Sequence, residues 1–126
     1  MKRRVVVCAT GKRIVIGNGR IELGFDRRAN GALVSLRDPE SGWEFIRDAA
    51  APKTLFRLAL RPAKGPVRWL DSRDAKRFRT GAETAPNGTA RLTLEAARFP
   101  GAAGIAVTVE VTLAPDSAMS AWRVRV

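Results

Sequence analysis

The sequence has 126 residues, the length of one domain with one hydrophobic core. Hydrophobic residues make up 45% and charged residues 28%, which is typical of a chain that folds into a globular domain. One cysteine and no histidine exclude an internal disulfide framework, a four-cysteine zinc site and any histidine-dependent catalytic triad. The net charge of +11 suggests an anionic polymer as a partner.

The first ten residues share only a basic start with signal peptides. The apolar run covers Val5 to Ala9 alone, which is shorter than the core of a signal peptide. We therefore predict a strand at Val5 to Thr10, with the thiol of Cys8 buried in it, and a cytoplasmic protein. No segment approaches the roughly 20 apolar residues of a membrane span, so we expect no membrane partner.

A hairpin dominates the segment from Asn18 to Ile46. Apolar residues alternate with others from Ile21 to Phe25, which is the period of a strand with one buried face. Asn30-Gly31 then predicts a tight turn, because both residue types tolerate a positive φ. The return strand is expected to turn three residues to one face: Ala32, Val34 and Leu36.

Short strands separated by turn signals continue to the end of the sequence, with a loop at Gly81 to Gly88 and at most one helical turn, at Arg47 to Ala51. This pattern predicts an all-β fold, an antiparallel β-sandwich of about eleven short strands in a single domain at 1–126. Within the strand at 54–61 we expect an inner face of Phe56, Leu58 and Leu60 and an outer face of Leu55, Arg57, Ala59 and Arg61. The other expected strands are Lys12–Ile16, Trp43–Ile46, Val67–Asp71, Ala75–Thr80, Ala90–Ala96, Ile105–Leu113 and Ala118–Val126.

The last strand still alternates at the final residue. Trp122, Val124 and Val126 form an apolar row that needs partner strands to cover it. The row favours the front part of a longer protein, truncated at the C-terminus, and predicts self-association of the isolated chain. The alternative is an edge strand that ends a short protein.

Three segments together resemble a known domain family: IELGFDRRANGALVSLRDPESGWEFI at 21–46, LFRLALR at 55–61 and VTVEVTLAPDSAMSAWRVRV at 107–126. In the order of strands and turns they are similar to the N-terminal galactose-mutarotase-like, or super-sandwich, domains of bacterial glycoside hydrolases. The resemblance implies the first part of a non-catalytic accessory sandwich that supports a downstream catalytic domain. We expect no cofactor. Mutarotases of this fold use histidine and glutamate, so the lack of histidine speaks against that activity here.

Sugar binding requires exposed aromatic planes with polar groups beside them. Trp69 and Trp43 are the candidates, and Trp69, which lies between Arg68 and Asp71, is the better placed for exposure. Trp122 belongs to the apolar row of the last strand, so we expect it in the core. Packing remains the expected role of all three tryptophans.

The stretch from Lys53 to Arg79 is strongly basic, with nine basic residues against two acidic ones. Aromatic residues are interleaved, as in sheets that bind single-stranded nucleic acid, but RNP-like and GXXG signatures are missing. The alternative function is therefore a free-standing module for anionic polysaccharide or, less favoured, nucleic acid. Its candidate residues are Arg68, Arg73, Lys76, Arg77 and Arg79. Charge that serves solubility alone is the plainer explanation, and a small homo-oligomeric structural protein is a third hypothesis.

Carboxylates occur on the outer strand faces, at Glu22, Glu95 and Glu110. Glycoside hydrolysis needs two carboxylates about 5–10 Å apart, but solvated strand faces normally carry such residues. We therefore expect no catalytic residues and no metal ligands in this chain.

Overall fold

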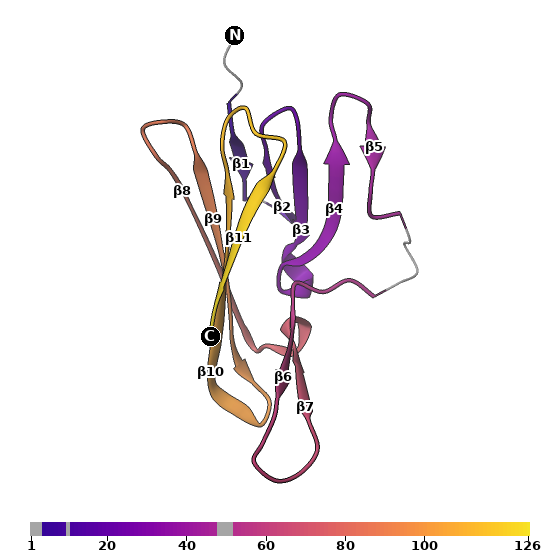
Figure 1. Ribbon diagram of the computed structural model, residues 1–126, viewed down its shortest axis with the longest axis vertical. Coiled ribbons are helices and arrows are strands. Elements are labelled where there is room, and N and C mark those ends of the chain that lie inside the picture. Colours follow the sequence, from indigo (N-terminus) through magenta and orange to yellow (C-terminus); the bar gives the residue numbers. More distant parts are fainter. Residues whose placement is uncertain (1–3, 10, 48–51) are drawn as a thin grey trace.

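The computed structural model describes residues 4–9, 11–47 and 52–126 (Figure 1). This part of the chain contains eleven strands and two 3₁₀ turns, so the predicted all-β class and the expected number of strands are confirmed. Every strand pairing in it is antiparallel. None of its helical segments is long and apolar enough to cross a membrane. The helical turn predicted at Arg47 to Ala51 falls mainly on residues 48–51, outside the described residues.

Three sheets build the fold. The first has the strand order β1-β2-β3-β4-β5, the second has the order β11-β10-β9-β8, and β6 and β7 form a separate hairpin. The bounds in the first sheet are β1 (Val6–Cys8), β2 (Arg13–Gly17), β3 (Glu22–Asp26), β4 (Ala32–Asp38) and β5 (Trp43–Glu44). The others are β6 (Arg57–Leu60), β7 (Arg68–Asp71), β8 (Arg77–Thr84), β9 (Ala90–Phe99), β10 (Ala102–Leu113) and β11 (Ser120–Arg125). The 3₁₀ turn η1 (Arg27–Ala29) follows β3, and η2 (Ser72–Asp74) follows β7.

One face of the long strands β9 and β10 carries both hydrophobic clusters. The first cluster joins the second sheet to the first sheet and consists of Ile14, Ile16, Leu23, Phe25, Ala90, Leu92, Leu94, Val109, Val111 and Leu113. The second cluster joins the same sheet to the β6–β7 hairpin and consists of Leu70, Ala75, Ala96, Phe99 and Val107. The first sheet and the hairpin thus cover successive parts of one face of the second sheet, which makes a two-layer sandwich (Figure 1).

The turn between β3 and β4 lies where the sequence predicts it. Asn30 and Gly31 have φ angles of 53° and 81°, both in the left-handed region. Because η1 precedes them, the connection is longer than a two-residue hairpin turn. A Cβ on Gly31 would lie 2.9 Å from Cζ of Phe78, so this turn also packs closely against β8.

A β-bulge changes the predicted inner face of β4. Phe25 pairs with Leu33 whereas Gly24 pairs with Ser35, so Val34 is the extra residue. The bulge shifts the alternation, and Leu33 packs against the core in the place expected for Val34. The prediction for Val34 was wrong because the sequence gives no sign of the bulge.

Three further predictions were wrong because the observed strands begin, end or face differently from the expected ones. Gly81 to Thr84, expected in a loop, continue β8 because they pair with β9. Leu55, expected on an outer face, packs against the core because it precedes β6 and does not follow that strand's alternation. Cys8 is exposed, since its neighbour Val7 is the residue of β1 that packs inward.

Candidate functional site

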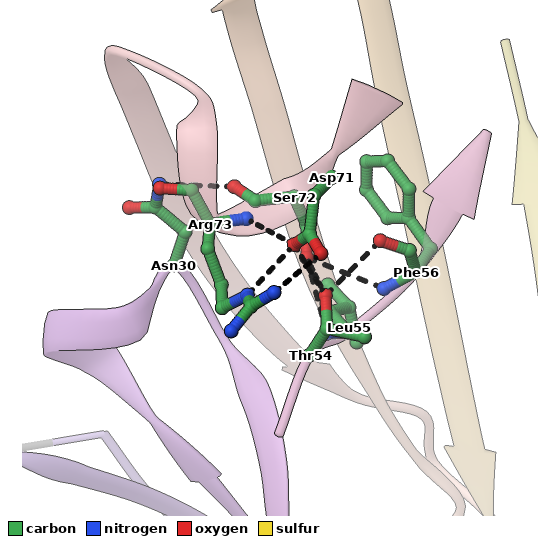
Figure 2. A network of polar contacts seen from close by, with 7 residues as sticks. All are labelled: Asn30, Thr54, Leu55, Phe56, Asp71, Ser72 and Arg73. Carbon is green, nitrogen blue, oxygen red and sulfur yellow. Dashed lines mark hydrogen bonds and ion pairs between the residues drawn. The ribbon is translucent and has the colours of Figure 1, made fainter. Parts of the chain in front are cut away.

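A buried serine fixes the end of β7 against the segment before β6. Ser72 is fully buried, and its Oγ accepts hydrogen bonds from the backbone N–H groups of Leu55 and Phe56 at 3.1 and 3.3 Å. The N–H group of Ser72 donates in return to the carbonyl oxygen of Phe56 at 3.1 Å. Figure 2 shows Ser72 at the centre of these contacts. The hairpin is therefore held by polar contacts as well as by the second hydrophobic cluster.

The Asp71 carboxylate is tied to Arg73 and to Thr54. Its Oδ1 accepts from the N–H and Nε of Arg73 and from Oγ1 of Thr54, and Oδ2 lies 2.8 Å from Nη2 of Arg73. The hydrogen bond from the Arg73 side chain is the main cause that lowers the pKa of Asp71 to about 2. Asp71 is therefore ionised at neutral pH and cannot serve there as a general acid.

Asn30 links the β3–β4 turn to the same network. Its Nδ2 donates towards three carbonyl oxygens, at 3.0 Å to Ser72, 3.2 Å to Arg73 and 2.8 Å to Ala75. The left-handed backbone of Asn30 gives the side chain this direction, and asparagine tolerates that conformation better than most residues. First sheet, hairpin and η2 are thus joined at one point, as Figure 2 shows.

Trp69 stands on the outer face of the β6–β7 hairpin. It is 56% exposed, and the guanidinium carbon of Arg57 lies 4.8 Å from the centre of its ring. Packing was the expected role of Trp69, and this prediction was wrong. The hairpin has only two strands, and the second cluster covers only its Leu58, Leu60 and Leu70 side, so the opposite side faces solvent.

The other two tryptophans lie elsewhere. Trp43 on β5 is 50% exposed, with the guanidinium carbon of Arg47 at 4.2 Å from the ring centre, so its expected packing was also wrong. Trp122 on β11 contacts Phe25, with 5.9 Å between ring centres, but stays partly exposed. Figure 1 places β5 and β7 towards opposite ends of the long axis. Trp43 and Trp69 therefore do not form one sugar-binding surface.

A pocket of about 320 Å³ opens beside Trp69, between η2 and the turn that joins β9 to β10. Arg68 lines it, but its guanidinium already donates to the carbonyl oxygens of Gly101 and Pro100 at 3.0 and 2.7 Å. Its complete lining is Arg68, Trp69, Leu70, Arg73, Asp74, Ala75, Lys76, Phe99 and Pro100. The pocket therefore places the exposed indole of Trp69 beside charged side chains of both signs, a setting that suits binding of a polar ligand.

Three of the five basic candidates line the pocket beside Trp69, and two do not. Arg68 and Arg73 are held by partners within the protein. Lys76 is exposed, and its ammonium group has no hydrogen-bond or ion-pair partner among the described residues. Arg77 and Arg79 lie on the outer face of β8, because Phe78 between them packs against the first cluster. The structure thus brings Arg68, Arg73 and Lys76 together with Trp69 and leaves Arg77 and Arg79 outside the pocket.

The stacked arginines were missed by the sequence analysis. Arg47 follows Trp43 by four residues, a spacing that could have suggested a contact. Arg57 lies twelve residues before Trp69, and only the pairing of β6 with β7 brings the two together. No sequence signal indicated that contact.

The three carboxylates on outer strand faces are divided between two sheets. Glu22 lies in the first sheet near Arg37, whereas Glu95 and Glu110 lie on the outer face of the second sheet. Burial acts to raise the pKa of Glu44, but hydrogen bonds led by that from Ser35 outweigh it and lower the pKa. Residues 4–9, 11–47 and 52–126 hold no group of three acidic, cysteine or histidine side chains placed to bind a metal ion.

Comparisons with protein-family models, with curated proteins and with solved structures gave no match to this chain.

Proposed function

We propose that this chain is a non-catalytic, cytoplasmic β-sandwich domain that accompanies the catalytic domain of a carbohydrate-active enzyme and contributes Trp69 to sugar contacts. The exposed indole of Trp69 carries the proposal, because sugar rings stack on exposed aromatic planes. The network around Ser72 holds the hairpin in place, so the indole is presented from a fixed element. The resemblance of three segments to accessory domains of glycoside hydrolases supports the carbohydrate assignment.

The pKa values of Asp71 and Glu44 make these two carboxyl groups unsuited to act as a general acid. Glycoside hydrolysis uses one carboxyl group whose pKa is raised, so that it stays protonated near neutral pH. Asp71 and Glu44 are the carboxyl groups with the most internal hydrogen bonds, and the pKa of each is lowered. Their hydrogen bonds serve the fold, at the hairpin and at the β4–β5 turn.

Titration calorimetry with neutral and uronate-containing oligosaccharides tests the sugar contact. Trp69→Ala is expected to weaken binding about tenfold, the loss typical of a central aromatic contact. Trp43→Ala is the matched control, because Trp43 is similarly exposed and also stacks with an arginine, but lies on β5. Equal effects of the two substitutions, or unchanged binding by Trp69→Ala, would contradict the proposal.

The intact mass of the natural gene product tests the accessory role. A product far above the 13.7 kDa of this sequence is expected, since the proposal requires a catalytic domain on the same chain. A product of 13.7 kDa would contradict it.

The exposed cations at the start of β8 favour a second candidate, a free-standing module for anionic polysaccharide or nucleic acid. Lys76 and Arg79 are exposed, and Arg77 lies between them on the chain. Retention on heparin should then fall steeply with salt, because each contact with an anionic polymer releases counterions. Serine at these three positions should abolish retention. Serine at Lys12, Arg28 and Arg47 removes the same charge elsewhere, and an equal loss there would contradict a localised site.

A further inference from the structure

The pocket beside Trp69 has an apolar floor and a polar rim. Leu70, Ala75 and Phe99 line it and are buried, whereas Trp69 and Lys76 are exposed. Its volume of about 320 Å³ lies at the lower end of the roughly 300–1,000 Å³ typical of ligand pockets, so it suits one unit of a sugar chain. Figure 1 shows that the β6–β7 hairpin and the turn between β9 and β10, which border the pocket, lie at the same end of the molecule.

Arg68 is held in this pocket without losing its charge. Its Nη1 and Nη2 donate to the carbonyl oxygens of Gly101 and Pro100 at 3.0 and 2.7 Å. Both acceptors are neutral, and Arg68 forms no ion pair with a carboxylate among the described residues. A guanidinium has five N–H groups, so three are left over from these two hydrogen bonds. Arg68 is therefore a fixed cation with donors available to a ligand.

Gly101 makes room for this guanidinium. Its φ of 74° lies in the left-handed region, and a Cβ built on it would collide with Nη2 of Arg68 and lie 3.1 Å from Cζ. Glycine therefore lets the guanidinium lie directly against the backbone of the β9–β10 turn. The turn fixes the position of the cation before a ligand arrives, which reduces the cost of ordering the side chain on binding.

The charges around the pocket leave one positive charge uncompensated. Arg73 pairs with Asp71 at 2.8 Å, and Asp74 follows in η2. When Arg68 and Lys76 are included, three cations stand against two carboxylates. Lys76 has no ion-pair partner among the described residues. A ligand with a single negative charge would therefore balance the site.

We propose that this pocket binds a uronate unit, the carboxylate-bearing sugar of an acidic oligosaccharide. The inference rests on the sugar contact proposed for Trp69 and specifies its substrate class. Arg57 lies over one face of the indole, which leaves the other face for the sugar ring. The carboxylate would accept hydrogen bonds from Arg68 and Lys76, and the planar N–H groups of an arginine match the two oxygens of a carboxylate.

Titration calorimetry at physiological salt with matched oligosaccharides tests the substrate class. The panel consists of tetrasaccharides of galacturonate, glucuronate, mannuronate and guluronate, each beside its methyl ester, which keeps the sugar ring but removes the charge. At least one uronate is expected to bind about tenfold more tightly than its ester, the gain from one charge-assisted hydrogen bond.

The outcomes separate this proposal from the sugar contact on which it rests. Equal binding of uronate and ester throughout the panel would overturn the uronate assignment and leave the sugar contact of Trp69 standing. No binding of either form would contradict both. A sulfated oligosaccharide that binds as tightly as the best uronate would show a general anion site and would also overturn the assignment.

Two variants locate the carboxylate beside Arg68. Arg68→Gln should weaken binding of the best uronate about tenfold and leave binding of its ester unchanged. Gly101→Ala keeps every charge but displaces the guanidinium, so it should weaken uronate binding similarly. Gly65→Ala is the matched control, because Gly65 also has a positive φ but its Cβ would meet only Pro62, at 3.9 Å.

Trp69→Ala should weaken binding of the uronate and of its ester alike, since it removes the stacking surface of the ring. Circular dichroism melts verify that each variant is folded. An equal loss of ester binding with Arg68→Gln would assign Arg68 to general sugar binding and would overturn the proposal. Equal losses of uronate binding with Gly65→Ala and Gly101→Ala would do the same, because the position of the guanidinium would then not matter.

Discussion

Replacing Asp71 by asparagine should measure how much its ionised carboxylate stabilises the fold. The pKa of Asp71 is lowered from 3.8 to about 2, mainly by the Arg73 side chain. Because one pKa unit corresponds to roughly 1.4 kcal/mol, the carboxylate contributes about 2 kcal/mol at neutral pH. Asparagine keeps the shape and one acceptor oxygen but removes the charge. The free energy of unfolding should therefore fall by about that amount.

Urea denaturation at several pH values is the assay. The folded pKa lies below the unfolded value, so the contribution is complete above about pH 4 and is lost as the pH falls towards about 2. The difference between the parent and Asp71→Asn should shrink over this window. Asp74→Asn is the matched control, since it makes the same chemical change at an exposed side chain in the 3₁₀ turn that Asp71 caps. The reasoning is refuted if Asp74→Asn costs as much, or if the difference for Asp71→Asn does not change with pH.

Three other substitutions test the packing and the polar contacts of the same region by urea denaturation at neutral pH. Gly31→Ala and Gly42→Ala both introduce a Cβ at positive φ, but only the Cβ at Gly31 meets Phe78. Gly31→Ala should therefore lower the free energy of unfolding by at least about 1 kcal/mol more than Gly42→Ala. Equal losses would contradict the close approach of Gly31 to Phe78. Ser72→Ala leaves two backbone N–H groups without their acceptor and should cost about 3 kcal/mol, whereas a cost below about 1 kcal/mol would mean that water replaces the hydroxyl. Asn30→Asp turns a donor that faces three carbonyl oxygens into a carboxylate, so it should destabilise by about 2 kcal/mol or more, and an unchanged midpoint would contradict this role.

Hydrophobic alternation was sufficient to predict the inner strands of the second sheet, which have a neighbouring strand on each side. The row from Val107 to Leu113 alternates regularly in the sequence and forms the buried face of β10. The Asn30-Gly31 turn was equally readable, because its residue types are adapted to a positive φ. The bulge at Val34 was not readable, since inserting one residue into a strand leaves no mark in composition.

The candidate site was less predictable because it depends on which faces remain uncovered. Trp69 alternates into an outward position, but its exposure follows from the hairpin having two strands and a cover on one side only. The charge of Arg68 and Arg73 predicts binding of an anion, but the fold supplies both with internal partners: two carbonyl oxygens for Arg68 and the Asp71 carboxylate for Arg73. A sequence shows the charge of a side chain, whereas its availability depends on tertiary contacts.

The face that β9 and β10 share has a consequence for how the protein folds. These strands are joined by the short turn at Pro100-Gly101 and pair over most of their length, so their hairpin requires little loop closure and can form early. The first sheet and the β6–β7 hairpin then dock on separate stretches of that hairpin, through different clusters. Amide hydrogen exchange should accordingly be slowest in the middle of β9 and β10, because their amides become exposed only when both layers have detached.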